Sequence, residues 1–218
     1  MKNNEDLQKD VQDAIKWEPL LNAAEIGVTA KDGVITLTGI VDSYDKKIQA
    51  EDAAKSVAGV KAVVEKIEIQ YSSMGIKGDN EIADDILNTF NWNWEFPNDK
   101  VNVKVEDGWV TLEGELIWNF QKEAAKKSVS KVIGVKGVTN NITIKSETND
   151  SIEKKDIERA LKSNWSISER EIIVEVSGNI VTLNGTVHSL YQKDQAGRIA
   201  WNAPGIWKVN NELVIENK

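Results

Sequence analysis

The chain has 218 residues, with 35 acidic and 27 basic side chains, a formal net charge of −8, no cysteine and one histidine. Without cysteine it can form no disulfide framework, zinc–thiolate site or iron–sulfur cluster, and a single histidine excludes a multi-histidine metal site. The acidic total disfavours sequence-independent binding of nucleic acid, which requires clustered positive charge. The proportions, 40% hydrophobic and 28% charged, are typical of a globular protein.

The N-terminal residues do not resemble a secretory leader. Met1 is followed by Lys2 and by polar residues 3–6, without an apolar run or a small-residue cleavage site. No stretch approaches the roughly 20 apolar residues that a transmembrane helix requires. As written, the sequence predicts a cytoplasmic protein, and a periplasmic one if an export signal has been trimmed from it.

Two short motifs recur three times at a constant separation. The first, Thr-Leu-x-Gly, ends at Gly39, Gly114 and Gly185. The second begins 20 residues later in every copy, at Gly59, Gly134 and Gly205. This spacing predicts three repeated units in residues 1–72, 73–146 and 147–218, with these six glycines in structural roles.

Each unit begins with an amphipathic helix. Apolar residues spaced four apart predict its buried face: Leu7, Val11 and Ile15, then Ile82, Ile86 and Phe90, then Ile157 and Leu161. At the expected starts of the second and third of these helices, Asp79 and Asp150-Ser151 supply acceptors for the free backbone amides.

Two strands follow the helix. Alternating apolar residues predict a first strand with one buried face around Val28, Val103 and Val174. The dipeptides Asp32-Gly33, Asp107-Gly108 and Gly178-Asn179 then predict two-residue hairpin turns, because these residues tolerate a positive φ. On the returning strand we expect Leu37, Leu112 and Leu183 to share one buried site. The glycine that follows, inside the strand, predicts a bulge or the close approach of a helix backbone.

A second helix, near residues 44–57, 120–132 and 191–203, has an alanine-rich face and should end at the second glycine motif. A third strand closes each unit. Because crossovers between parallel strands are right-handed, this strand should lie parallel beside the second one. The predicted fold class is therefore α+β: three tandem αββαβ units, each with a three-stranded mixed sheet and two helices on one face.

The segment from Gly33 to Val60, with its Thr-Leu-x-Gly and Gly-Val motifs and its equivalents in the other units, resembles the BON domain. The Val-x-Asn close of that family is present as Val138-Thr139-Asn140 and Val209-Asn210-Asn211, whereas unit one has Val63-Val64-Glu65. The resemblance covers essentially the whole chain. It implies a non-enzymatic binding module linked to osmotic and envelope stress, in a family some of whose members are associated with phospholipid.

No group of residues points to catalysis or to a metal. His188 lies just past the second strand, where the other units carry Asp42 and Ile117, so we interpret it as a surface histidine. Carboxylate pairs such as Asp84-Asp85 are adjacent on a helix, diverge by about 100° and cannot chelate one ion together. We therefore predict no catalytic residue, no metal site and no cofactor.

Alignment of the three units divides the tryptophans into those expected in the core and those expected on the surface. Recurring positions favour core closure: Trp17 aligns with Trp92, and Trp94 aligns with Trp165. Trp109 aligns with apolar residues and is also expected to be buried. Trp118, Trp201 and Trp207 replace polar residues of the other two units, which predicts positions on the surface of the unit. Such exposed tryptophans gain from being covered, either by a neighbouring unit or by an external partner or membrane.

The second helix of unit two is rich in lysine. Lys122, Lys126, Lys127 and Lys131 lie opposite its apolar face, and unit one has Glu51 and Asp52 at the positions of Lys126 and Lys127. With the three tryptophans, these lysines form the candidate surface for a partner, lipid or neighbouring domain. We favour a stress-associated protein that contacts anionic phospholipid or an envelope protein. The alternatives are a protein-interaction array without a small ligand and an enzyme, and the sequence does not define an oligomeric state.

Overall fold

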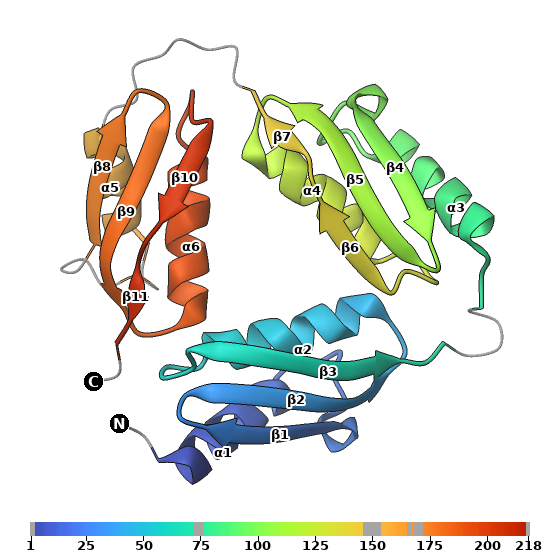
Figure 1. Ribbon diagram of the computed structural model, residues 1–218, viewed down its shortest axis with the longest axis horizontal. Helices are drawn as coiled ribbons and strands as arrows, with labels where there is room; N and C mark the ends of the chain where they lie inside the picture. The colour runs from blue at the N-terminus through green and yellow to red at the C-terminus, as the bar shows by residue number, and fades with distance from the viewer. Residues whose placement is uncertain (1–2, 72–75, 146–153, 165–166, 168–171, 217–218) are drawn as a thin grey trace. The chain divides into compact units, whose positions relative to one another are not determined.

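The computed structural model describes residues 3–71, 76–145, 154–164, 167 and 172–216 (Figure 1). Within this part of the chain, three sheets each combine with two helices in the order helix, strand, strand, helix, strand. The prediction of three tandem αββαβ units is confirmed.

Unit one contains α1 (Asn4–Lys16), β1 (Ile26–Lys31), β2 (Val34–Val41), α2 (Tyr44–Ser56) and β3 (Ala62–Ile69). A short 3-10 turn, η1 (Ala23–Glu25), precedes β1. The sheet order is β1-β2-β3, with β1 antiparallel to β2.

Unit two contains α3 (Asp79–Trp92), η3 (Asn98–Lys100), β4 (Val101–Glu106), β5 (Trp109–Leu116), α4 (Asn119–Ser130), β6 (Gly137–Asn140) and β7 (Thr143–Ile144). Strand β4 is antiparallel to β5, whereas β6 and β7 are both parallel to β5, as the crossover through α4 predicts.

Unit three contains α5 (Lys154–Lys162), β8 (Ile172–Ser177), β9 (Ile180–Val187), α6 (Leu190–Trp201), β10 (Lys208–Asn211) and β11 (Val214–Ile215). Its strand pairing repeats that of unit two: β8 is antiparallel to β9, and β10 and β11 are parallel to it.

The three cores are equivalent. Leu37, Leu112 and Leu183 are fully buried and pair in register with Val28, Val103 and Val174 of the preceding strand. In unit two, the buried residues of α3 and α4 join those of β5 in one cluster, so both helices cover the same face of the sheet. The second helices bury alanine, because small side chains allow close packing on the sheet.

The strand glycines make room for neighbouring backbone. Gly39 and Gly114 have φ angles of 135° and 144°, and a Cβ atom there would lie 2.0 and 2.1 Å from the carbonyl oxygens of Glu25 and Lys100. This confirms a close backbone approach, made by the 3-10 turn before the first strand. The second glycines, Gly59, Gly134 and Gly205, also have positive φ, as predicted. They lie three to four residues beyond the second helix of their units, however, so the prediction that the helix ends at this glycine was wrong.

The prediction that the Asp79 side chain caps the first helix of unit two was wrong. Helix α3 begins at Asp79 itself, after Gly78, whose backbone N–H donates to Glu81 Oε2 at 3.0 Å. The Asp79 carboxylate is not free to cap the helix because it accepts hydrogen bonds from the β4–β5 hairpin turn. Asp150 and Ser151 lie outside the described residues.

The third strand differs between units. In unit one it runs unbroken as β3, whereas in units two and three it stops at Asn140 and Asn211 and resumes after a gap of two residues. The Asn140 side chain turns to the helix, where Nδ2 donates to the Lys122 carbonyl oxygen at 2.9 Å. Asn211 makes the same bond to the Lys193 carbonyl at 2.7 Å. The Val-x-Asn sequence therefore ties the third strand to the second helix, and unit one has Glu65 in its place.

Candidate binding surfaces

The four lysines of the second helix of unit two do not share one surface. Lys122 is half-buried, and its Nζ donates to the Ile142 carbonyl oxygen at 2.6 Å. Burial lowers the pKa of this ammonium group. In unit three, Lys193 Nζ makes the equivalent bond to the Leu213 carbonyl at 2.7 Å. The geometry gives Lys122 a structural role between helix and strand, which separates it from the surface lysines with which the sequence grouped it.

Of the remaining lysines, Lys127 lies on the exposed side of α4 and Lys131 is the C-cap residue of this helix. Phe120, Glu123, Lys127 and Lys131 follow at helical spacing and are all exposed, whereas Lys126 is half-buried. Ile133, just beyond the helix, is also exposed, so two large apolar side chains flank the lysines. We call Phe120, Lys127, Lys131 and Ile133 the basic row of unit two. The other units do not carry two lysines there, since Asp52 and Arg198 stand at the position of Lys127, and Ser56 and Asn202 at that of Lys131.

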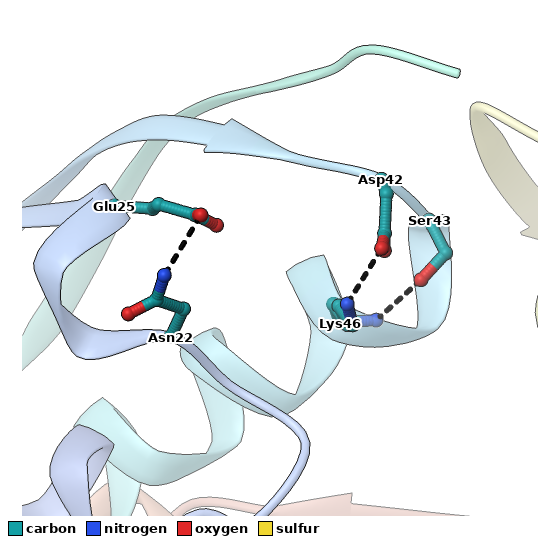
Figure 2. Close-up of polar contacts among 5 residues, drawn as sticks. All are labelled: Asn22, Glu25, Asp42, Ser43 and Lys46. Carbon is teal, nitrogen blue, oxygen red and sulfur yellow. Dashed lines mark hydrogen bonds and ion pairs between the residues drawn. The ribbon is translucent and has the colours of Figure 1, made fainter. Parts of the chain in front are cut away.

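Trp118 occupies the N-cap of α4, where the other units have serine. Ser189 Oγ accepts a hydrogen bond from the Gln192 backbone N–H at 3.2 Å at the start of α6. In unit one, Ser43 Oγ accepts one from Lys46 N at 3.4 Å (Figure 2). The half-buried Trp118 side chain offers no acceptor, and α4 therefore lacks a side-chain cap from this residue.

The residue before this cap also differs between units. In unit one, Asp42 pairs with Lys46 at 2.7 Å, and this hydrogen bond lowers the pKa of the Asp42 carboxyl (Figure 2). In unit three, His188 takes this place and is half-buried, with Nδ1 3.4 Å from the Glu216 carbonyl oxygen. Among the described residues, no three histidine, aspartate or glutamate side chains gather as they would for a metal ion.

Trp201 and Trp207, both in unit three, have different surroundings. Trp201 ends α6 and is half-buried against the core of its own unit, so the prediction of a surface position was wrong for this residue. The position lies at the rim of the core: Ser130, its equivalent in unit two, is itself buried and bonds through Oγ to the Lys127 carbonyl at 2.9 Å. Trp207, by contrast, is 51% exposed.

The three recurring tryptophans that the structure describes are exposed, contrary to the core role predicted for them. Trp17, Trp92 and Trp94 are 84%, 89% and 91% exposed, and Trp165 lies outside the described residues. Trp17 and Trp92 each follow the last buried residue of the first helix, Ile15 or Phe90, by two positions. Two helical residues span about 200°, which turns these side chains away from the core. This angular offset is the signal in the sequence that could have identified them.

Trp109 is also more exposed than predicted, at 58%. It is the first residue of β5 and alternates with the buried Val110 and Leu112, so it belongs to the outer face of the sheet. A Cβ atom on Gly137 would lie 2.3 Å from the Trp109 ring, which shows that the ring covers the neighbouring strand β6.

Buried contacts fix the segment that carries Trp92 and Trp94. Phe90 and Phe96 are buried and meet edge to face, with ring centroids 4.9 Å apart. Between them, Asn93 Nδ2 donates to Ser128 Oγ on α4 at 2.8 Å. The two tryptophans are therefore presented outward from a segment held by its neighbours on both sides.

Three αββαβ units in succession define a tandem array of small α+β domains. A family model for the BON domain matches residues 3–71, 78–146 and 149–217. The chain therefore belongs to the BON-domain family, as the repeated motifs predicted.

The chain is 30% identical over 129 residues to Osmotically-inducible protein Y of Escherichia coli (strain K12). This alignment covers 57% of the chain and 64% of that protein, so the chain spans less than two thirds of the length of this relative. In the described residues, none of the helices combines the length and apolar character needed to cross a bilayer.

Two solved structures of CdsD, a structural protein of the Type III secretion system of Chlamydia trachomatis, also match the chain. They are 16% and 15% identical to it, with TM-scores of 0.25 and 0.26. The matches cover 97% and 99% of the chain, and 92% and 100% of the respective structures. TM-scores this low carry no functional argument.

Proposed function

We propose that this chain is a non-catalytic, stress-associated binding protein whose second unit docks on anionic phospholipid. The observation that carries the proposal is the basic row of unit two, in which exposed Lys127 and Lys131 lie between exposed Phe120 and Ile133, with one exposed carboxylate, Glu123, a turn before Lys127. Membership of the BON-domain family and the similarity to an osmotically inducible protein support the stress association.

The chemistry of the row suits a charged bilayer surface. A lysine near anionic headgroups contributes up to about 1 kcal/mol, and this attraction weakens as salt screens it. Apolar side chains beside the lysines can enter the boundary between headgroups and acyl chains. With two exposed lysines, we expect weak, salt-sensitive binding that depends on the whole row.

Vesicle flotation tests the proposal directly. The full chain should float with vesicles containing phosphatidylglycerol at low salt, and not with pure phosphatidylcholine vesicles. Lys127→Glu/Lys131→Glu should abolish flotation. Lys100→Glu/Lys104→Glu is the matched control, because it makes the same charge change in the same unit at exposed residues outside α4.

Circular dichroism and thermal melting should first show that both double variants are folded. Equal flotation of the wild-type chain and the Lys127→Glu/Lys131→Glu variant would contradict the assignment of the row. Equal loss in both double variants would indicate a general charge effect and would contradict it as well.

A further inference from the structure

We propose that the first-helix ends of units one and two are docking surfaces for an arginine-rich segment of a partner polypeptide. Trp17 forms the centre of one surface, and Trp92 and Trp94 form the centre of the other. This inference is independent of the lipid surface proposed on α4. That surface is basic, whereas the two tryptophan surfaces belong to acidic stretches of the chain.

The first argument is that Trp92 and Trp94 are exposed on a segment that buried contacts hold in place. Trp92 and Trp94 leave nearly their whole side chains in water, although Phe90, Phe96 and Asn93 hold the segment in place. Exposed tryptophan is unusual in a protein surface and typical of interface anchors. A fixed segment loses little conformational entropy when a partner binds, so the surface is preorganised.

The second argument is charge. Residues 76–99 contain six carboxylates and one lysine, and that lysine, Lys77, is paired with Asp85. Residues 3–25 contain six carboxylates and two lysines. Both tryptophan surfaces therefore lie in acidic stretches, which attract a cationic partner and repel an anionic bilayer.

The third argument is that the two surfaces suit arginine better than lysine. A tryptophan is followed directly by a glutamate in both units, as Trp17-Glu18 and Trp94-Glu95. A guanidinium group can stack on an indole ring and can also make two parallel hydrogen bonds to a carboxylate. The compact ammonium group of lysine offers neither the planar stacking nor the bidentate geometry.

Unit three differs at the same helix. Helix α5 carries Lys154, Lys155, Arg159 and Lys162 against only two carboxylates, Asp156 and Glu158. The acidic surroundings found in units one and two are absent from this helix, so we restrict the docking surfaces to those two units.

The test measures binding of fluorescein-labelled peptides to the full chain by fluorescence anisotropy. The probes are an octa-arginine and an octa-lysine peptide. The wild-type chain should bind octa-arginine more tightly than octa-lysine. The triple variant Trp17→Ala/Trp92→Ala/Trp94→Ala retains all charges, and it should bind octa-arginine about 5- to 30-fold more weakly and lose the preference for arginine.

Two further variants separate stacking from charge. Trp207→Ala removes a tryptophan of unit three that is also exposed, and it should leave binding of both peptides unchanged. Glu18→Gln/Glu95→Gln should weaken both peptides, with the larger loss for octa-arginine. A melting curve for each variant checks folding, which we expect to be retained because none of the replaced side chains is buried: Glu18 is half-buried and the others are exposed.

Several results would overturn the proposal. Unchanged peptide binding in the triple variant would show that the peptides are attracted only by the overall negative charge of the chain. Insertion of Trp17, Trp92 or Trp94 into phosphatidylcholine or phosphatidylglycerol vesicles would identify a membrane as the occupant. Concentration-dependent self-association that the triple variant abolishes would identify a second copy of the chain instead.

Discussion

Asp79 Oδ1 accepts a hydrogen bond from the backbone N–H of Gly108 at 2.9 Å, which joins the start of α3 to the hairpin turn between β4 and β5. The Asp107 N–H donates to the other carboxylate oxygen at the same distance. In unit one, Asn4 Oδ1 accepts from the Asp32 N–H at 2.9 Å. A polar residue at the start of the first helix thus holds the hairpin in both units.

Replacing this carboxylate should destabilise unit two. Asp79→Ala leaves two backbone amides without their acceptor, and we expect a loss of about 1–3 kcal/mol in the free energy of unfolding. Asp79→Asn keeps one acceptor oxygen, as Asn4 does in unit one, and should retain part of that stability. Hydrogen exchange of unit-two peptides measures both effects. If Asp79→Ala left the exchange rates of unit two unchanged, the two hydrogen bonds that Asp79 accepts would contribute nothing to its stability.

The missing cap at Trp118 leads to a second prediction. Trp118→Ser and Trp118→Ala both remove the indole ring, but only serine can accept a hydrogen bond at the start of α4. The serine variant should therefore be more stable than the alanine variant by about 0.5–2 kcal/mol. Urea unfolding of the two variants, followed by far-ultraviolet circular dichroism, compares them. Equal midpoints would mean that α4 does not respond to a cap.

Trp201 and Trp207 should respond differently to truncation. Trp201 packs against the core of its unit, so Trp201→Ala should cost about 1–3 kcal/mol, less than for a fully buried tryptophan. Trp207 is half exposed, and Trp207→Ala should change stability by no more than about 0.5 kcal/mol. Differential scanning calorimetry of the full chain distinguishes them. Equal shifts in the two melting temperatures would contradict the different packing.

Gly114 should not tolerate a side chain. Alanine there meets both a φ of 144° and a Cβ position 2.1 Å from the Lys100 carbonyl oxygen, and we expect a loss of about 2–4 kcal/mol. Gly178 is a suitable control, because its φ is 58° and, its two chain neighbours apart, no residue lies within 4 Å of the added Cβ. Gly178→Ala should cost only the conformational penalty of about 1–2 kcal/mol. Chemical denaturation of both variants provides the comparison.

The Asp42–Lys46 pair predicts a small pH dependence. Because the hydrogen bond from Lys46 lowers the folded-state pKa of Asp42, the pair stabilises the fold above the unfolded pKa. This contribution is lost as the pH falls through the folded pKa. Solvent screens this exposed pair, so Asp42→Asn should cost less than about 1 kcal/mol at pH 7. Unfolding at neutral pH and near pH 2 measures the difference, and an equal effect at both values would contradict the assignment.

The repeated motifs predicted the fold well because each reflects a backbone requirement. Leu37, Leu112 and Leu183 lie at one buried position, and the strand glycines are needed where the 3-10 turn approaches. Such requirements recur in every copy of a domain. They can therefore be recognised in the sequence without knowledge of the surrounding structure.

The tryptophans were harder to place because recurrence alone does not distinguish a core position from a repeated surface position. Trp17 and Trp92 align, yet both point away from the core because of their angular offset from Ile15 and Phe90. The opposite error occurred at Trp201, where polar residues in the other units suggested exposure. Ser130 shows that a small polar residue can be buried there when its hydroxyl bonds to a helix carbonyl.

The interrupted third strand also affects how these units resist aggregation. Strands at the edge of a sheet offer unpaired backbone groups to which a strand of another chain can add. In units two and three, Asn140 and Asn211 break the row of such groups at the point where they bond to the second helix. Unit one keeps the longer β3, and the charged residues Glu65, Lys66 and Glu68 lie along it. The asparagine that bonds to the second helix in units two and three thus also protects the edge strand of their sheets. In unit one, the charged residues of β3 serve this purpose.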